Sequence, residues 1–429
     1  MSCPEPDPSS NAVHDEQIAR IAGKIDTAAA VPNNLASFGA GKHQFRLNPA
    51  LNEVTVTEFE RAHDVRLPEP YRRFITVLGD GGAGPSYGLL PLAQAFGEVS
   101  DSYSGHLAAA SPFQSGMTYG DGWWDEFANE ELRRDPCQGA IAVVHHGCTS
   151  YTLLIVSGPA RGRLVAIDFN GVPAPYVLED TDFLSWYERW LDELAAGYDV
   201  TRMSRRSPEG NDLLAIAVAD PNDERRARAT WSLCALPALT PSAHQALTGL
   251  AADPIPAVRG AALGIIRHRQ VTEGHQAARA ALDDDDPAVR AAAISALRAL
   301  VIPDLAGIAR ALLHDPSEEV ITRAVWALRD SSEMTVADLA PLASSPHASL
   351  RVTAIHYLRY AVGPGTDELL SAALNDEKPA IRWTAVQVIE HLSLRRLQPR
   401  LAALLNTETD PTVLINLRRA APELARHQG

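Results

Sequence analysis

The residues best suited to binding a metal are His145, His146 and Cys148, which lie together in the sequence HHGC. Imidazole and thiolate groups are ligands that Zn²⁺ prefers, so zinc is the first chemistry to consider. Adjacent residues of a β-strand point to opposite faces, however, so the two histidines would not bind one ion together. The sequence offers no second ligand pair at a spacing typical of zinc sites. We therefore expect a strand end followed by a glycine turn, and no metal or other cofactor.

Two other motifs could bind ions. Residues 79–84, GDGGAG, lie between a helix and a strand and lack the Lys-Ser/Thr pair of a P-loop, so we expect a turn. The four aspartates at 283–286 lack the alternating spacing of a calcium loop. We expect them to begin a helix, where the helix dipole stabilises negative charge. No nucleophile, base and orienting acid can be assembled from the sequence, so we predict no catalytic residues and no enzymatic activity.

The first candidate binding surface combines arginine with aromatic side chains, the residues that dominate the binding energy of protein interfaces. Its residues are Arg267, Arg298, Arg329, Arg359, Trp326, His356, Tyr360 and Trp383. The alternative is that these arginines only pair with acidic loops of adjacent repeats. A second row is expected to bridge to aspartates in turns and to be structural: Arg259, Arg290, Arg351 and Arg382.

The second candidate surface is an acidic and aromatic loop in the N-terminal half. Its residues are Asp121, Trp123, Trp124, Asp125 and Glu126, with Asp80 in the glycine loop. Clustered carboxylates would attract a cationic protein, and an exposed indole ring would anchor it. The alternative is that both tryptophans belong to the core.

The elements that position these residues differ between the two halves. Helical spacing of apolar residues predicts helices over 13–30, from Thr57 to the Leu67-Pro68 break, from Pro70 to Leu78 and over 181–196. Thr57 can cap the second of these helices, with Glu60 completing a capping box. The segments AIAVVHHG, YTLLIVSGP and GRLVAIDF predict antiparallel strands. Helices packed on one antiparallel sheet form an α+β domain.

The segments TEFE, LPEPYRRF and GDGGAGPSYGLLPL, with HHGCTSYTLLIVSGPARGRLVAIDF and DFLSWYERWL, resemble the SUKH (Smi/Knr-like) superfamily. The resemblance extends over residues 13–197. It implies an α+β domain that binds other proteins and performs no catalysis. Many bacterial members are immunity proteins that neutralise toxins, and others are regulatory binding modules.

We expect residues 1–12 to form a disordered tail and residues 198–212 a linker. Beyond the linker, the sequence repeats about every 31 residues, with an alanine four positions after most anchors. The apolar anchors are Val258, Val289, Val320, Leu350, Ile381 and Val413. Stacked helix pairs explain such a period, because neighbouring pairs bury a core that none could bury alone. The pattern resembles HEAT repeats of the lyase-like type and predicts an α-solenoid of about seven repeats over residues 213–425.

Charge is unevenly distributed along the chain. Residues 1–200 carry 27 acidic and 13 basic side chains, whereas residues 201–429 carry 26 and 25. The acidic half should repel nucleic acids and membranes and attract cationic proteins, unless it serves solubility alone. The four cysteines show no paired spacing, and we find neither a signal peptide nor a membrane span. These features predict a cytoplasmic protein.

The sequence as a whole predicts a non-enzymatic binding protein with an immunity role. The acidic domain would mask a basic toxin or nuclease, and the solenoid would cradle a second surface of it. The alternative is a regulatory or assembly scaffold with an endogenous protein partner. A third hypothesis is a HEAT-like nucleic-acid-binding or repair protein, which the arginine row favours and the net charge of −15 opposes.

Overall fold

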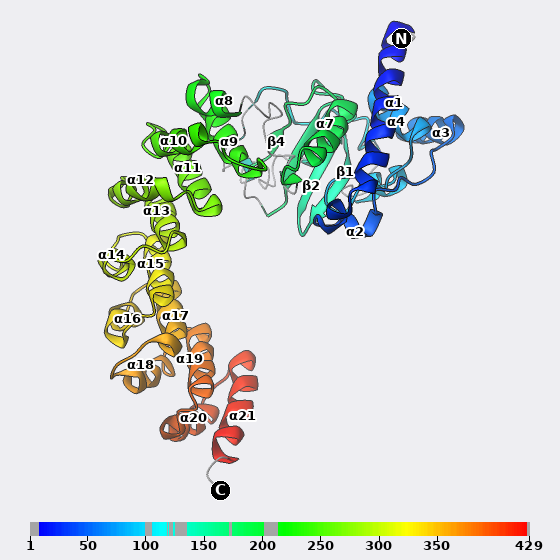
Figure 1. Cartoon of the computed structure of the whole chain (residues 1–429). Helices are drawn as coiled ribbons and strands as arrows, with labels where there is room; N and C mark the ends of the chain where they lie inside the picture. The colour runs from blue at the N-terminus through cyan, green and yellow to red at the C-terminus, as the bar shows by residue number, and fades with distance from the viewer. Residues whose placement is uncertain are drawn as a thin grey trace. The chain divides into compact units, whose positions relative to one another are not determined.

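The computed structural model describes residues 8–98, 105–117, 119, 123–124, 135–170, 174–200 and 213–426. The chain folds into two compact units, Met1–Thr240 and Pro241–Gly429. The first contains a sheet with helices, and the second consists of helices joined by short turns (Figure 1). No helix in the described ranges is long and apolar enough to cross a membrane.

The first unit has helices before and after its sheet. They are α1 (Pro8–Ala30), α2 (Ala40–His43), α3 (Glu53–His63), α4 (Glu69–Val77), α5 (Leu92–Gly97), α7 (Phe183–Ala195), α8 (Leu213–Ala219) and α9 (Asp223–Ser232). Short 3-10 turns lie at Pro32–Ala36 and Leu233–Ala235. Helix α1 begins at Pro8, so residues 8–12 are helical although we expected a disordered tail there.

Helix α3 begins earlier than its sequence pattern predicts. Asn52 is its N-cap, and the Asn52 side-chain oxygen accepts a hydrogen bond from the Thr55 backbone N–H at 2.8 Å. The Thr57 hydroxyl donates to the carbonyl of Glu53 at 2.8 Å, as it does inside a helix. The predicted capping box of Thr57 and Glu60 is therefore wrong, because asparagine caps at least as well as threonine and lies one turn earlier.

The sheet is antiparallel and has four strands in the order β1-β2-β3-β4. The strands are β1 (Ala140–Gly147), β2 (Ser150–Ile155), β3 (Leu164–Asp168) and β4 (Tyr176–Val177). The first three confirm the three predicted segments. Strand β4 was not expected, because two residues are too few to show an alternating pattern.

Both faces of the sheet are buried, by different side chains. One face shares a core with Tyr71, Phe74 and Trp190 of helices α4 and α7. The other shares a core with Phe113 and Trp123. Residues 140–143 of β1 alternate between the two clusters, as the geometry of a strand requires, and the alternation breaks at Val144, where the pairing with β2 shifts register. The first unit is therefore an α+β fold in which α4 and α7 cover one face of the sheet.

The first compact unit extends beyond the predicted linker and includes α8 and α9. The Arg225 Nε lies 3.4 Å from Glu179 Oε2, and the Arg228 guanidinium lies 3.5 Å from the centre of the Tyr176 ring. In the predicted linker, residues 201–212 lie outside the described residues, whereas Val200 is buried. The pair α8–α9 is thus fixed to the sheet edge formed by β4.

The second unit is a series of six helix pairs. These helices are α10 (Pro241–Leu250), α11 (Pro256–Arg269), α12 (His275–Ala280), α13 (Pro287–Ala299), α14 (Leu305–Leu312), α15 (Glu318–Ser331), α16 (Val336–Ala343), α17 (Ala348–Tyr357), α18 (Thr366–Ala373), α19 (Pro379–His391), α20 (Gln398–Leu405) and α21 (Pro411–Arg426). The second helices of the pairs, α11 to α21 in odd numbers, pack against one another in series (Figure 1). Together with α8–α9, these make seven helix pairs in the part of the chain that the structure describes.

The repeat anchors form the core between these helices. All six are at most 3% exposed, from Val258 and Val320 at 0% to Leu350 at 3%. The alanines four positions later are all 0% exposed: Ala262, Ala293, Ala324, Ala354 and Ala385. A methyl group at this position lets the neighbouring helix approach closely. The anchors and the alanines therefore confirm the predicted repeat core.

Candidate functional site

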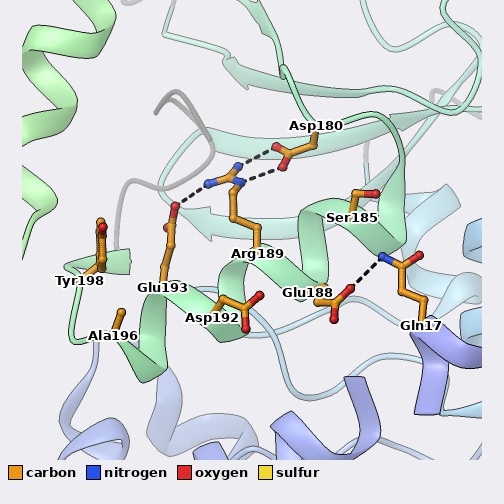
Figure 2. Close-up of a pocket in the computed structure, with 9 residues that line it drawn as sticks. All are labelled: Gln17, Asp180, Ser185, Glu188, Arg189, Asp192, Glu193, Ala196 and Tyr198. Atoms are coloured by element: carbon orange, nitrogen blue, oxygen red, sulfur yellow. Dashed lines mark hydrogen bonds and ion pairs between the residues drawn. The ribbon is translucent and has the colours of Figure 1, made fainter. Parts of the chain in front are cut away.

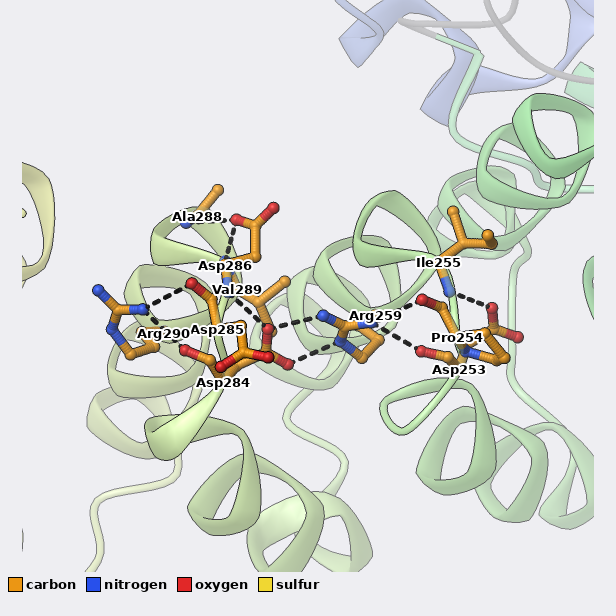
Figure 3. Close-up of polar contacts among 10 residues, drawn as sticks. All are labelled: Asp253, Pro254, Ile255, Arg259, Asp284, Asp285, Asp286, Ala288, Val289 and Arg290. Atoms are coloured by element: carbon orange, nitrogen blue, oxygen red, sulfur yellow. Dashed lines mark hydrogen bonds and ion pairs between the residues drawn. The ribbon is translucent and has the colours of Figure 1, made fainter.

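A ladder of arginines and carboxylates joins the turns of successive repeats. Arg259 donates to both carboxylate oxygens of Asp284, at 2.7 and 2.6 Å, and to the carbonyls of Asp253 and Pro254, at 2.9 and 3.0 Å (Figure 3). The same pattern recurs for Arg290 with Asp315, Arg351 with Asp376 and Arg382 with Glu408. The prediction that this row is structural is confirmed.

The ladder is interrupted in one repeat, and both partners are missing together. Ile321 stands in α15 where the other repeats have arginine, and it is buried. Ser345 stands where the facing repeat would supply the carboxylate, and its hydroxyl accepts from the backbone N–H of His347 at 3.2 Å. An arginine without its carboxylate would be poorly compensated at this buried position, which explains the paired replacement.

The other arginine row lies on the second helices and partly forms a groove. This groove has a volume of about 470 Å³ and lies on α11, α13 and α15. We call it the arginine groove, and its lining residues are Arg267, His268, Ser295, Arg298, Ala299, Arg323, Trp326 and Asp330. The structure thus brings together three residues of the predicted surface, Arg267, Arg298 and Trp326.

Trp326 lies close to two guanidinium groups. The guanidinium carbon of Arg323 is 4.7 Å from the indole centre, and that of Arg298 is 5.9 Å from it. Both distances are within the range of cation–π attraction, which holds the two arginines near the ring. Arg323 was missed at the sequence level, although its position three residues before Trp326 on one helix could have revealed it.

Asp330 binds two members of the predicted row. The Arg298 Nε donates to Asp330 Oδ2, and Arg329 Nη1 donates to Asp330 Oδ1 at 2.7 Å. Burial alone would raise the pKa of Asp330, but the bonds from Arg329 and Arg298 outweigh it and lower the pKa. The alternative interpretation is that the arginines pair with acidic residues of adjacent repeats. It holds for Arg298, which binds Asp330 of the next repeat. Arg267 is exposed and forms no ion pair among the residues that the structure describes.

The remaining residues of this predicted surface lie outside the groove. The Arg329 guanidinium lies 5.2 Å from the ring centre of Tyr360, which is 45% exposed. Arg359 turns back and donates to the carbonyl of His356 at 3.0 Å. Trp383 lies on α19, is half-buried and does not line the groove.

The second predicted surface needs correction. Trp123 is 8% exposed and stacks on Phe113, with ring centres 5.5 Å apart. Trp124 is half-buried and packs against Phe169, with ring centres 5.9 Å apart. The interpretation of two exposed indoles is wrong for Trp123, because the second face of the sheet needs an aromatic cover. Asp121, Asp125 and Glu126 lie outside the described residues.

Asp80 has a structural role in the glycine loop. Its Oδ1 accepts a hydrogen bond at 2.7 Å from the backbone N–H of Leu92, the first residue of α5. Its carbonyl accepts from the Asn48 side chain at 2.9 Å. Burial raises the pKa of Asp80, and the bond from Leu92 opposes that rise. Asp80 therefore holds the glycine loop against the start of α5.

An acidic pocket of about 510 Å³ lies between α1 and α7 in the first unit. Figure 2 shows the Arg189 guanidinium between two carboxylates. It donates to both carboxylate oxygens of Asp180, at 2.7 and 2.6 Å, and to Glu193 Oε1 at 3.0 Å. Glu188 accepts from Gln17 at 3.0 Å and also pairs with Lys24 at 2.8 Å. Burial would raise the pKa of Glu188, but these bonds and that from Arg20 lower it to about 2. Glu188 thus holds α1 on α7, whereas Asp180 and Glu193 bind Arg189 of α7 itself.

One contact in the first unit has the elements of a nucleophile. Ser86, in the sequence GPSYG, has its Oγ 2.8 Å from His146 Nδ1, and His146 Nε2 lies 2.7 Å from the Thr152 hydroxyl. A histidine beside a serine can activate it, but a triad also needs an acid that orients the histidine. Here the second nitrogen meets a hydroxyl group, and Ser86 is only 8% exposed. The geometry is that of a link between the glycine loop and the sheet.

The residues considered as metal ligands, for which no metal is expected, make other contacts. His145 Nε2 lies 3.1 Å from the Cys148 carbonyl, whereas His146 faces Ser86 and Thr152. Within the described ranges, no group of three or more His, Cys, Asp or Glu residues is placed to hold a metal ion.

Comparison with known proteins identifies the helical part of the chain. The model of the family described as HEAT repeats matches residues 210–298, 245–329 and 336–421. A search of the curated proteins gives no match. No family match begins before residue 210, so the SUKH resemblance of residues 13–197 stays a prediction.

The solved structures that match this chain are remote in sequence. The Escherichia coli protein YibA is 17% identical, with 55% of this chain and 91% of that chain covered and a TM-score of 0.42. The complex of CpcE and CpcF of phycocyanin lyase from Nostoc is 16% identical, with 49% of this chain and 93% of that chain covered and a TM-score of 0.31. Human deoxyhypusine hydroxylase is 22% identical, with 51% of this chain and 85% of that chain covered and a TM-score of 0.27. The family match and the helix pairs together show that the C-terminal region is a solenoid of HEAT repeats.

Proposed function

We propose that this chain is a non-enzymatic scaffold that binds a protein partner through the arginine groove. The observation that carries the proposal is the cluster of Trp326 with Arg298 and Arg323 in a hollow on three successive repeats. Tryptophan and arginine in a concave, partly desolvated setting are the residues that contribute most to protein interfaces. HEAT-repeat proteins commonly act as protein-binding scaffolds, which supports the same function.

The more specific proposal is that the chain is a cytoplasmic immunity protein that neutralises a toxin by stoichiometric binding. Its support is the SUKH resemblance of the first unit and the excess of acidic residues there. A basic toxin or nuclease would bind the acidic first unit. The competing proposal is a regulatory or assembly scaffold with an endogenous partner, and the HEAT repeats support both equally.

A nucleic-acid-binding function has less support. The arginine groove suits phosphate groups, but Asp330 lies inside it and the chain carries a net charge of −15. Proteins that bind nucleic acids neutralise several phosphates at once and present a continuous basic surface.

The proposal is tested by affinity capture from a lysate of the native cells, followed by quantitative mass spectrometry. The variant R267E/R298E reverses two charges in the groove, and the matched control R395E/R400E reverses two exposed charges elsewhere in the second unit. We expect one protein to be captured by the wild type and the control but lost from the groove variant. Equal recovery by all three proteins would refute the proposal.

A further inference from the structure

We infer that the arginine groove is specific for an acidic segment of the partner protein, which places carboxylates on the groove arginines and an apolar side chain against Trp326. The inference rests on the proposed function and adds the chemistry of the partner. It also gives the two units ligands of opposite charge. The acidic first unit would bind a basic toxin, whereas the arginine groove would bind an acidic segment.

The charge of the lining supports an acidic ligand. Three arginines and His268 line the groove, against the single carboxylate of Asp330. Arg323 also pairs with Glu319 at 3.1 Å, but that carboxylate is on the exposed side of α15 and is 56% exposed. An exposed ion pair contributes little free energy, so a ligand carboxylate can replace it at low cost.

The protein's own Asp330 shows how a carboxylate is held there. Its two oxygens accept hydrogen bonds from two different arginines, Arg298 and Arg329. The guanidinium group presents several N–H donors in a fixed plane that matches a carboxylate. After bonding to Asp330, Arg298 retains unused donors, and Arg267 faces the groove from the preceding repeat with no ion pair among the described residues.

The arrangement favours an acidic peptide segment over a nucleic acid. Phosphates recur at short and regular intervals along a nucleic acid, so one of them would meet Asp330 and Glu319 as well as the arginines. Carboxylates of a peptide can be spaced to avoid these acids, with an apolar residue between them for the indole. The pairing of charge with one aromatic anchor is typical of short peptide recognition.

The inference is tested with two synthetic peptides and the full-length protein. The first is a fluorescein-labelled peptide of alternating Glu-Glu-Leu triplets, and the second has glutamine in place of every glutamate. We expect the acidic peptide to bind with an affinity that falls as salt increases, and the glutamine peptide to bind at least about tenfold more weakly. The variant R267Q/R298Q should lose affinity by a similar factor, whereas R395Q/R400Q should bind like the wild type.

Several outcomes would overturn the inference. They are equal binding of the two peptides, equal binding by R267Q/R298Q, and displacement of the acidic peptide by duplex DNA at lower concentration than by unlabelled peptide. If the peptide fails to bind but R267E/R298E still loses its captured partner, the groove binds protein of another chemistry, and only the inference fails. If the peptide binds as expected while partner capture is unchanged, the inference holds and the proposed function fails.

Discussion

Arg290 donates hydrogen bonds to both carboxylate oxygens of Asp315 in the next repeat, at 2.7 and 2.9 Å. The same guanidinium donates at 2.7 Å to the carbonyl of Asp284, whose carboxylate is bound by Arg259. Asp284 and Asp376 therefore each receive one arginine through the side chain and the next through the backbone carbonyl. The relationship fixes the spacing of neighbouring turns and leaves the arginine groove to other residues.

Replacing Arg290 by alanine should destabilise the second unit by about 1–3 kcal/mol, because the half-buried Asp315 loses its charged partner. Urea unfolding followed by circular dichroism measures the change. The exposed Arg395, replaced in the same way, serves as the control and should change the free energy of unfolding by less than about 0.5 kcal/mol. Similar values for the two variants would mean that the ladder contributes nothing to stability.

The missing step of the ladder can be restored. The variant I321R alone should be destabilised, because it places an arginine opposite Ser345 and removes a buried isoleucine. Adding S345D should recover about 1 kcal/mol of that loss through a carboxylate–guanidinium pair. A double-mutant cycle measures the coupling, and additive effects of the two substitutions would show that the turns do not meet as described.

Acid should weaken the last step of the ladder. The hydrogen bonds from Arg382 lower the pKa of Glu408 to about 2. A carboxyl group whose folded pKa is depressed stabilises the fold above its unfolded pKa, and this stability is lost as the pH falls toward the folded value. Stability should therefore fall between about pH 5 and pH 2, and E408Q should flatten that part of the profile. An unchanged profile in E408Q would argue against the pair.

Trp123 should behave as a core residue. Its replacement by alanine should cost about 3–5 kcal/mol of unfolding free energy, because the ring is buried against Phe113. Replacement of Tyr360, which is 45% exposed, should cost far less. A small loss for Trp123 with loss of partner binding would restore the original interpretation of an exposed anchor.

The sequence predicted the repeat well because its signal is periodic. The anchors and the alanines that follow them, such as Val289 and Ala293, recur in most units, so chance agreement is small and each repeat reinforces the others. The start of α3 was placed one turn late, because a capping residue acts through local geometry that several polar residues can supply. Asn52 and Thr57 are both good candidates by residue type alone.

The sites were less predictable because they depend on contacts between distant residues. The sequence placed Arg298 and Trp326 on one surface, but the role of Asp330 in binding two arginines required the packing of α13 on α15. The buried position of Trp123 depended on the sheet, because its ring covers the second face together with Phe113, and the sequence does not show which residues meet there. The Ser86–His146 contact joins residues that are 60 positions apart, and no local pattern could reveal it.

The most direct test of the central claim is site-specific photo-crosslinking in native cells. A photoreactive amino acid is placed at Ala299, which lines the arginine groove, and at Ala402, which is exposed on α20. The account predicts that one protein is crosslinked at position 299 and not at position 402. Absence of any crosslink at position 299, or the same products from both positions, would show that the arginine groove is not the partner-binding surface.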